Sequence, residues 1–356
     1  MNFFCILGDC GNTYCHHCYP VINCSKSHTY CNTHGTCKEI MKGTQCETIL
    51  VTGCAGFIGS HVCENLLKED YNVIGIDIIN TYYDVDIKLN NLSLLESHPN
   101  FLFLKEDICN TQVISRYKPD KIIHLASMAG VRYSIENPSL YEKTNIGGFI
   151  HIMEESIKNK VKLIVYASSS SVYGLNKKVP FSETDPIQTC NSPYACSKLA
   201  MEIFAKTYYQ LYQLPNIGLR FFTVYGPRGR PDMAPYKFLN AIKNETSFIK
   251  FGDGSTSRDY TYIDDIACGI ISAMKNKKEV QSEVYNLGNS TPVTLNEFIK
   301  LCEEVTNKKA IYEEIPMQIG DVPHTYADIS KAKNDLEYEP KTSLKDGLTS
   351  MFKSMS

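Results

Sequence analysis

The sequence lacks the features that mark membrane or nucleic-acid-binding proteins. No apolar run approaches the roughly 18–20 residues that a membrane-spanning helix needs. The formal net charge of −3 gives no excess of positive charge for nucleic acid or an anionic membrane. Residues 1–9 have no basic segment, and their apolar stretch is too short for a secretory signal. These absences predict a cytoplasmic protein with neither a membrane nor a nucleic acid as partner.

Cysteine, by contrast, is concentrated at one end of the chain. Of the 15 cysteines, eight lie in the first 46 residues, at positions 5, 10, 15, 18, 24, 31, 37 and 46. Residues 1–46 show neither helical nor strand periodicity, which predicts a separate Cys/His-rich extension. With His16, His17 and His34 these thiols could hold zinc, but their spacing fits no zinc pattern well, and we assign no metal ligand. Disulfides, or an extension with no role in catalysis, are the alternatives.

From Glu47 onward, strand and helix patterns alternate, which predicts a parallel sheet covered by helices. We expect an α/β fold of the Rossmann, doubly wound type over residues 47–226. Residues 227–356 should form mainly a smaller, C-terminal substrate-binding lobe. The expected strands are Thr48–Thr52, Asn72–Asp77, Phe101–Leu104, Lys121–Ala126, Lys162–Ser168, Ile217–Phe222, Phe248–Phe251 and Val284–Leu287. The expected helices are Ile58–Lys68, Val113–Tyr117, Pro138–Ser156, Pro193–Tyr212, Asp264–Lys275 and Leu295–Thr306.

A glycine motif between the first strand and helix predicts a dinucleotide site. Gly53, Gly56 and Gly59 have the G-x-x-G-x-x-G spacing, in which they permit a tight turn, the approach of a pyrophosphate and close helix packing. The N-terminus of the helix that follows supplies free N–H groups to the phosphates. At the end of the second strand, Asp77 would bind both ribose hydroxyls and repel a 2′-phosphate, which favours NAD over NADP.

Other residues of the same region are expected to line the cofactor site. Asp107 follows the third strand and could face the adenine, although an aspartate there is often a turn residue. The remaining cofactor contacts that we expect are Phe57, Ile58, Ile108 and Ala126, together with Tyr194 and Lys198.

Tyr194 and Lys198 are the candidate catalytic pair. Ser192 and Pro193 predict that a helix begins here, so the tyrosine and lysine are at i and i+4 on one face. An ammonium beside a phenol favours the phenolate, and a cationic nicotinamide would act in the same direction. The phenolate would then be a general base for a sugar hydroxyl.

With these motifs the chain resembles the extended short-chain dehydrogenase/reductase family of nucleotide-sugar epimerases, dehydratases and decarboxylases. The resemblance implies a third catalytic residue, a Ser or Thr before a Val-Tyr-Gly sequence. Here the segment is Ser168-Ser169-Ser170-Ser171-Val172-Tyr173-Gly174, in which Ser169 matches the catalytic position and Ser170 is the near alternative. The family also implies tightly bound NAD and a homodimer formed through Pro138–Ser156 and Pro193–Tyr212.

Within the family, residues from about 47 to 350 resemble the UDP-glucuronate 4-epimerase branch. The segments that carry the resemblance are Thr81–Asp84, Ala129–Ser134, Arg220–Gly226, Gly229–Ala234 and Gly320–Pro323. The resemblance implies that Arg230 and Thr223 hold the carboxylate of the uronate and that Arg258 holds the diphosphate of UDP. A planar guanidinium suits a carboxylate chemically. Arg132 is a further candidate for binding an anion.

Four other functions remain as alternatives. The 4,6-dehydratases of this family typically have Asp-Glu where Ser170 and Ser171 stand, and its decarboxylases tend to have Glu at the position of Ser171. Epimerases for neutral hexoses commonly have Asn at the position of Thr223. A non-enzymatic NAD-binding regulatory protein would not need Tyr194, Lys198 and Ser169. The sequence therefore favours an NAD-dependent isomerase that interconverts UDP-glucuronate and UDP-galacturonate through a 4-keto intermediate.

Overall fold

The computed structural model describes residues 47–187, 189–276, 278, 280–316 and 323–355. The cysteines and histidines proposed as zinc ligands lie outside these ranges, so the zinc hypothesis stays a prediction. Residues 46–356 form one compact unit by themselves, and everything below concerns that unit.

A parallel sheet of seven strands is the centre of this unit. Its order is β3-β2-β1-β4-β5-β6-β10, so the order reverses direction between β1 and β4. The expected doubly wound Rossmann sheet is confirmed. The strands are nearly continuous runs of buried aliphatic residues, as both faces of a parallel sheet require. Their bounds are β1 (Thr48–Thr52), β2 (Asn72–Ile76), β3 (Phe101–Leu104), β4 (Lys121–His124), β5 (Leu163–Ser169), β6 (Asn216–Phe221) and β10 (Ser282–Leu287).

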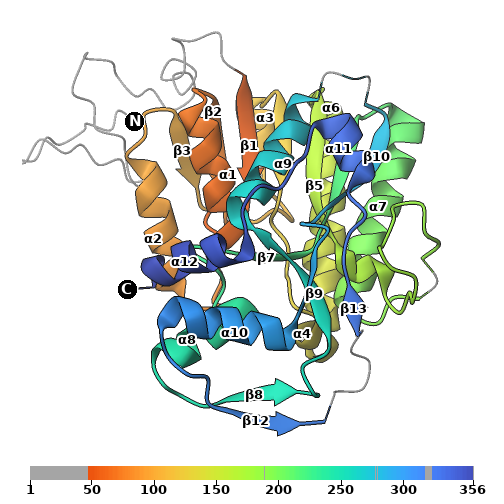
Figure 1. The fold of residues 1–356 in the computed structure, drawn as a ribbon. Coiled ribbons are helices and arrows are strands. Elements are labelled where there is room, and N and C mark those ends of the chain that lie inside the picture. The colour runs from red at the N-terminus through yellow and green to blue at the C-terminus, as the bar shows by residue number, and fades with distance from the viewer. Residues whose placement is uncertain (1–46, 188, 277, 279, 317–322, 356) are drawn as a thin grey trace, which may run out of the picture. The chain divides into compact units, whose positions relative to one another are not determined.

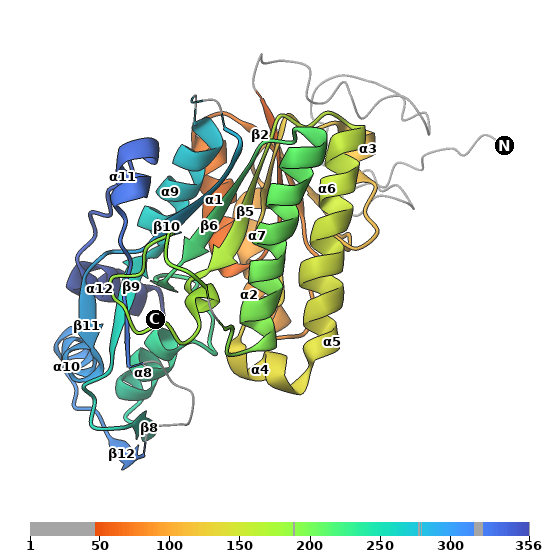
Figure 2. The same ribbon diagram turned by 90° about the vertical axis from the view of Figure 1, so that its right-hand side faces the viewer.

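Helices cover both faces of the sheet (Figure 2). One face is covered by α1 (Phe57–Lys68), α2 (Val85–Glu96) and α9 (Ile263–Lys275), and the other by α3 (Val113–Tyr117), α6 (Gly148–Lys158) and α7 (Pro193–Tyr212). The helix expected over Pro138–Ser156 is a continuous run of α5 (Pro138–Tyr141), a π-helical segment (Glu142–Gly147) and α6. The short helices α4 (Val131–Glu136) and α11 (Ser330–Leu336) complete this part.

A second, smaller set of elements lies beyond the carboxyl ends of the central strands (Figure 1). β9 (Ser257–Tyr262) pairs with β7 (Thr223–Tyr225), β11 (Pro292–Thr294) and β13 (His324–Thr325). β8 (Phe248–Phe251) pairs with β12 (Tyr312–Ile315), and the helices α8 (Ala234–Lys243), α10 (Leu295–Thr306) and α12 (Leu344–Ser354) accompany them. The sequence placed a lobe boundary at residue 226, but β10 and α9 follow that residue and return to the central sheet and its helical layer.

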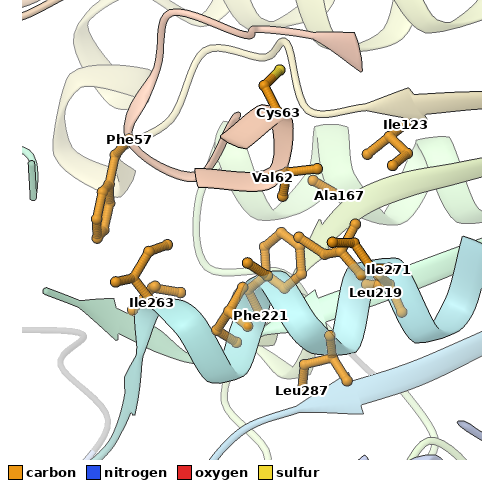
Figure 3. Close-up of a cluster of buried hydrophobic side chains, with 14 of the residues drawn as sticks. Phe57, Val62, Cys63, Ile123, Ala167, Leu219, Phe221, Ile263, Ile271 and Leu287 are labelled. Atoms are coloured by element: carbon orange, nitrogen blue, oxygen red, sulfur yellow. The ribbon is translucent and has the colours of Figure 1, made fainter. Parts of the chain in front are cut away.

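Apolar packing between α9 and the central sheet explains why α9 lies in the helical layer of that sheet. Its apolar stripe, which includes Ile263 and Ile271, packs toward Leu219 and Phe221 of β6, together with Val62 of α1 (Figure 3). All five side chains are buried. Burial of such an aliphatic or aromatic side chain contributes roughly 1.5–3 kcal/mol, so this stripe stabilises α9 against the sheet more strongly than any local propensity would.

The turn between β1 and α1 depends on glycine. Gly53 has φ +73°, and a Cβ there would lie 2.8 Å from the amide nitrogen of Ala126. A Cβ on Gly59 would lie 2.1 Å from the carbonyl oxygen of Gly53. Only glycine lets the first turn of α1 rest directly on the end of β1, and this contact places the N-terminus of the helix at the edge of the sheet.

A Gly59→Ala substitution should therefore lower the free energy of unfolding by about 1–3 kcal/mol, the usual effect of forcing an atom into a packed site. Gly147→Ala is the matched control, because its Cβ would meet no atom closer than 3.8 Å. That variant should be neutral or slightly stabilising, since alanine favours a helix. Urea unfolding measures both, and equal stability of the two variants would contradict the packing argument.

Candidate active site

A cavity of about 640 Å³ lies at the carboxyl ends of the central strands. It is placed where the strand order reverses, which is the usual ligand site of a doubly wound sheet. Fifteen of the residues selected from the sequence line it together: Gly53, Gly56, Phe57, Ile58, Gly59, Asp77, Asp107, Ile108, Ala126, Ser169, Ser170, Tyr194, Lys198, Thr223 and Arg230.

One end of the cavity is formed by the N-terminus of α1 and by Asp77. The helix is capped by Gly56, and no side chain bonds to its first N–H groups. The Asp77 carboxylate follows β2 and accepts hydrogen bonds from the backbone N–H of Ala55 (3.2 Å) and of Ile79 (2.8 Å). Burial raises the pKa of Asp77 above its ordinary value, although these two hydrogen bonds oppose the shift. A helix terminus without a side-chain cap, beside a nearly buried carboxylate, fits the pyrophosphate and ribose of a dinucleotide.

Sequence reasoning missed Lys88, which lines the same end of the cavity. Its Nζ donates hydrogen bonds to the carbonyl oxygen (3.0 Å) and the side-chain Oδ1 (2.6 Å) of Asn80. Burial lowers the pKa of this lysine, while the neighbouring Asp77 opposes the shift. The available signal was Asp84, which caps α2 by accepting from the N–H of Asp86 (3.0 Å) and would have placed Lys88 in the first turns of a helix.

Tyr194 and Lys198 lie at the start of α7, where the sequence placed them. The Ser192 side chain caps the helix by accepting from the N–H of Ala195 (3.1 Å), and Pro193 occupies the first turn. Lys198 Nζ donates to Ser127 Oγ (2.9 Å) and to the Ala167 carbonyl oxygen (2.7 Å), and it lies 6.0 Å from the centre of the Tyr194 ring. The lysine is thereby held between β5 and the loop after β4.

Burial shifts the pKa values of this pair in opposite directions. Burial raises the pKa of Tyr194, and neither a hydrogen bond with Ser169 nor the charge of Arg230 outweighs it. Burial also lowers the pKa of Lys198 to about 7, against the opposing charge of Glu202. The expected lowering of the Tyr194 pKa by the lysine and a cationic nicotinamide together stays a prediction.

The serine run forms the wall of the cavity next to Tyr194. Ser169 ends β5, and its Oγ accepts from the N–H of Ser171 (3.2 Å) at the start of a 3₁₀ turn, Ser170–Tyr173. Behind this wall, Ser168 donates a hydrogen bond to Glu202, which also forms a bidentate ion pair with Arg220 through Nε (2.9 Å) and Nη2 (2.7 Å). This buried pair fixes α7 against β5 and β6.

Arg230 reaches the cavity from the loop after β7. Its Nε and Nη2 donate to the two carboxylate oxygens of Asp232 (3.0 and 2.6 Å). The guanidinium also lies 5.4 Å from the centre of the Tyr82 ring. Neither Tyr82 nor Asp232 had been selected from the sequence as a site residue. The charge of Arg230 opposes the rise that burial causes in the pKa of Tyr194, so the guanidinium and the phenol act on each other within one cavity.

Two predicted anion-binding arginines do not line the cavity. Arg258, on β9, donates from Nη1 to the carbonyl oxygens of Ser257 (2.8 Å) and Pro323 (3.2 Å). The exposed Arg132 lies 5.4 Å from the centre of the Phe251 ring. Their selection rested on sequence position alone, and in this structure their guanidinium groups are held by backbone and aromatic partners instead.

Comparison with known proteins agrees with this geometry. Residues 50–351 match the family model described as GDP-mannose 4,6 dehydratase. The chain belongs to that family. An uncharacterised protein of Methanocaldococcus jannaschii is 45% identical over 85% of this chain and 94% of its own length. A UDP-glucuronate 4-epimerase of Thermodesulfobacterium geofontis is 43% identical over 84% of this chain and 93% of its own length.

A solved structure of UDP-glucuronic acid 4-epimerase from Bacillus cereus, in complex with UDP-glucuronic acid and NAD, is 37% identical. It covers 86% of this chain and 98% of its own, with a TM-score of 0.83. These findings confirm the predicted family and the prediction that the chain is an enzyme of the isomerase class, a nucleotide-sugar epimerase. In the described part of the chain, none of the helices has the length and apolar character to cross a membrane.

The buried amine gives a test of the catalytic pair. Because Lys198 has a folded-state pKa near 7 and an unfolded-state value near 10.5, the unfolded chain binds more protons between these pH values. Folding stability from this group is therefore present at high pH and is lost as the pH falls toward 7. A Lys198→Met variant has no amine to protonate, so it should escape this loss of stability. Its melting temperature should exceed that of the wild type at pH 6, and the difference should be smaller at pH 9.

The same variant should lose roughly 10²–10⁴-fold in turnover, the usual contribution of a group that serves proton transfer. Thermal unfolding at the two pH values, beside a turnover assay, measures both effects. A variant that is less stable than wild type at both pH values would contradict the burial argument.

Proposed function

We propose that this enzyme interconverts UDP-glucuronate and UDP-galacturonate, using bound NAD. The observation that carries the proposal is the presence of Arg230 in the same cavity as Tyr194, Lys198 and Ser169. A guanidinium presents two parallel donors and suits a carboxylate, whereas a neutral hexose offers it no anion. The similarity to UDP-glucuronate 4-epimerases supports the same substrate.

The cofactor end of the cavity fits NAD. The N-terminus of α1 and Gly56 would hold the pyrophosphate, and the carboxylate of Asp77 would bind the adenosine ribose and disfavour a 2′-phosphate. Lys88, Asp107 and Ile108 line the same end. When bound, NAD would accept the hydride from C4 of the sugar and return it.

Tyr194 is the proton acceptor in the proposed reaction. Its phenolate takes the proton of the C4 hydroxyl, while Ser169 stabilises the reacting oxygen with a hydrogen bond. Because burial raises the pKa of the phenol in the protein alone, its deprotonation would be favoured by a further positive charge, and a cationic nicotinamide ring would provide it. The resulting 4-keto sugar rotates within the cavity and presents its other face. Tyr194 then returns the proton to the C4 oxygen, and the configuration at C4 is inverted.

The 4-keto sugar is a β-keto acid, which loses carbon dioxide readily. Loss requires the bond between C5 and the carboxylate to align with the carbonyl π system. Arg230 and Thr223 would fix the carboxylate away from that alignment. The acidic residues that line the cavity are Asp77, Glu106 and Asp107 among the described residues, and all three follow β2 or β3 at the cofactor end. None of these lining acids comes from the serine run at Ser170 and Ser171, where a dehydratase or decarboxylase would need one, which favours epimerisation.

Incubation of the purified protein with UDP-glucuronate, without added NAD, tests the proposal. The expected result is an equilibrium mixture with UDP-galacturonate, formed with no net redox change by cofactor that stays bound. A Tyr194→Phe variant, which keeps the ring and removes the acidic hydroxyl, should be inactive. Formation of a UDP-pentose and carbon dioxide, with no UDP-galacturonate, would refute the epimerase function. Full activity of the Tyr194→Phe variant would show that the Tyr194–Lys198 pair does not carry out the proton transfer.

An Arg230→Lys variant separates charge from shape. It keeps the positive charge but loses the planar pair of donors, so the carboxylate is held less firmly. We expect KM for UDP-glucuronate to rise about tenfold, roughly the contribution of a charge-assisted hydrogen bond, and the share of UDP-pentose among the products to increase. Chromatography of the nucleotide sugars measures both. An unchanged KM and product ratio would exclude Arg230 as the carboxylate ligand.

We also propose a homodimer through α6 and α7. Exposed apolar side chains lie along α7 at Ile203, Leu211 and Tyr212, and on the neighbouring α5 at Leu140. Ile203 and Leu211, eight residues apart, lie on adjoining parts of one side of α7, and exposed apolar residues placed in this way are typical of a helix–helix interface. The double variant Ile203→Glu/Leu211→Glu should elute as a monomer in size-exclusion chromatography with light scattering. Leu94→Glu on α2, an equally exposed leucine, should leave the dimer intact. A wild-type monomer would contradict the proposal.

A further inference from the structure

Arg230 is already paired in this structure, and with the same kind of group that the proposed substrate would bring. Its Nε and Nη2 form a bidentate pair with Asp232, at 3.0 and 2.6 Å, which is the geometry that a guanidinium adopts with any carboxylate. Arg230 lines the cavity, whereas Asp232 does not. When a uronate enters the cavity, the Nε and Nη2 donors of Arg230 are therefore already bonded to the carboxylate of Asp232.

This pair differs in its surroundings from the Arg220–Glu202 pair behind the serine wall. Both side chains of that pair are buried, with 5% and 7% of their surface exposed, so neither can exchange its partner for water. In the Arg230 pair the arginine is 17% exposed and Asp232 is 36% exposed. A released Asp232 carboxylate can be hydrated at once, while Arg230 remains largely enclosed and needs a new anion.

The proposed reaction needs an exchange of this kind. Return of hydride to the opposite face of C4 requires the keto sugar to turn over, and the carboxylate on the adjacent C5 must move with the ring. During that turn the carboxylate has to leave the guanidinium. An enclosed guanidinium without a counterion is costly, so a second carboxylate within reach lowers the barrier to release.

We propose that Asp232 is an exchangeable counterion for Arg230, which yields the guanidinium to the uronate carboxylate on binding and takes it back while the sugar turns. The inference rests on the proposed function. Asp232 is a positioning residue in this scheme: it acts through Arg230 and touches neither the reacting atoms nor the cofactor. Tyr82, whose hydroxyl lies 3.4 Å from Asp232 Oδ2 and 3.5 Å from Arg230 Nη2, adjoins both partners of the exchange.

An Asp232→Asn variant tests the exchange. Without its competitor the uronate should bind more tightly, so that Kd by calorimetry and KM for UDP-glucuronate fall about two- to fivefold, the range for a partly exposed ion pair. Release during the turn should become slower, so kcat should fall by a similar factor and more reduced nicotinamide should accumulate in the steady state, measured by its absorbance. Binding of UDP-glucose, which has no carboxylate, should not tighten.

Three controls make the result decisive. Asp232→Glu keeps the carboxylate and should restore kcat and KM toward wild type. Asp253→Asn makes the same change of charge at an exposed carboxylate that accepts hydrogen bonds from Ser255 and does not line the cavity, and should have wild-type kinetics. Thermal unfolding confirms that each variant is folded.

The outcomes separate the two claims. A fall of both KM for UDP-glucuronate and kcat in Asp232→Asn supports the exchange. A rise in KM for UDP-glucuronate, unchanged constants, or equal effects on UDP-glucose overturn it while the proposed function stands. A wild-type enzyme that does not epimerise UDP-glucuronate overturns the proposed function and the exchange with it.

Discussion

The burial of one ammonium group is the constraint on which the active site depends. Lys198 Nζ is enclosed, with a hydroxyl of the loop after β4 and a carbonyl oxygen of β5 as its hydrogen-bond partners. To bring the amine there, α7 has to lie close against β5, and the Ser192 cap and Pro193 start the helix at the position that achieves it. Tyr194, one turn earlier in α7, is then fixed near the carboxyl end of β5. The cost of enclosing the amine is offset by apolar packing elsewhere in the sheet and its helices.

The structure uses two arginine–carboxylate pairs in different ways. Arg220 and Glu202 form a buried, bidentate ion pair, and Glu202 also accepts a hydrogen bond from Ser168. The pair holds α7, the helix that carries Tyr194 and Lys198, against the sheet. Arg230 and Asp232 have the same chemistry but lie at the border between cavity and solvent. A buried pair is difficult to break because either partner would be left as an uncompensated charge, whereas a half-exposed pair can exchange. Solvent access, rather than residue type, separates a structural pair from one available to a ligand.

Much of the site could be predicted because its residues occur in short local motifs. Gly53, Gly56 and Gly59 follow a strand and open a helix, and Asp77 ends the next parallel strand, so topology alone brings them to one edge. Tyr194 and Lys198 follow from a helix start. The residues that were missed depend on side-chain contacts that no local motif reveals. Asp232 pairs with Arg230, two residues earlier, and the Tyr82 hydroxyl reaches the same pair from a distant segment. Arg258 donates to the carbonyl oxygen of Pro323 and does not line the cavity.

The same reason explains why the return of the chain to the central sheet and the environment of Tyr194 could not be read from the sequence. β10 pairs with β6, more than 60 residues earlier, and no local pattern shows that a strand after residue 226 returns to the first sheet. The pKa of Tyr194 is decided by how completely the folded protein removes it from water, which an i, i+4 spacing does not reveal. For residues 1–46, zinc binding, disulfides and a non-catalytic extension stay the alternatives that the sequence predicts.

The central claim is that burial raises the pKa of Tyr194 and that a positively charged cofactor beside it lowers that pKa. Ultraviolet titration of the phenols, taken as the difference between wild type and Tyr194→Phe, measures this one group in protein stripped of NAD and in protein loaded with it. The account predicts a pKa above the ordinary tyrosine value without NAD and a clear fall when NAD is bound. A Tyr194 pKa that is the same in both states would contradict it.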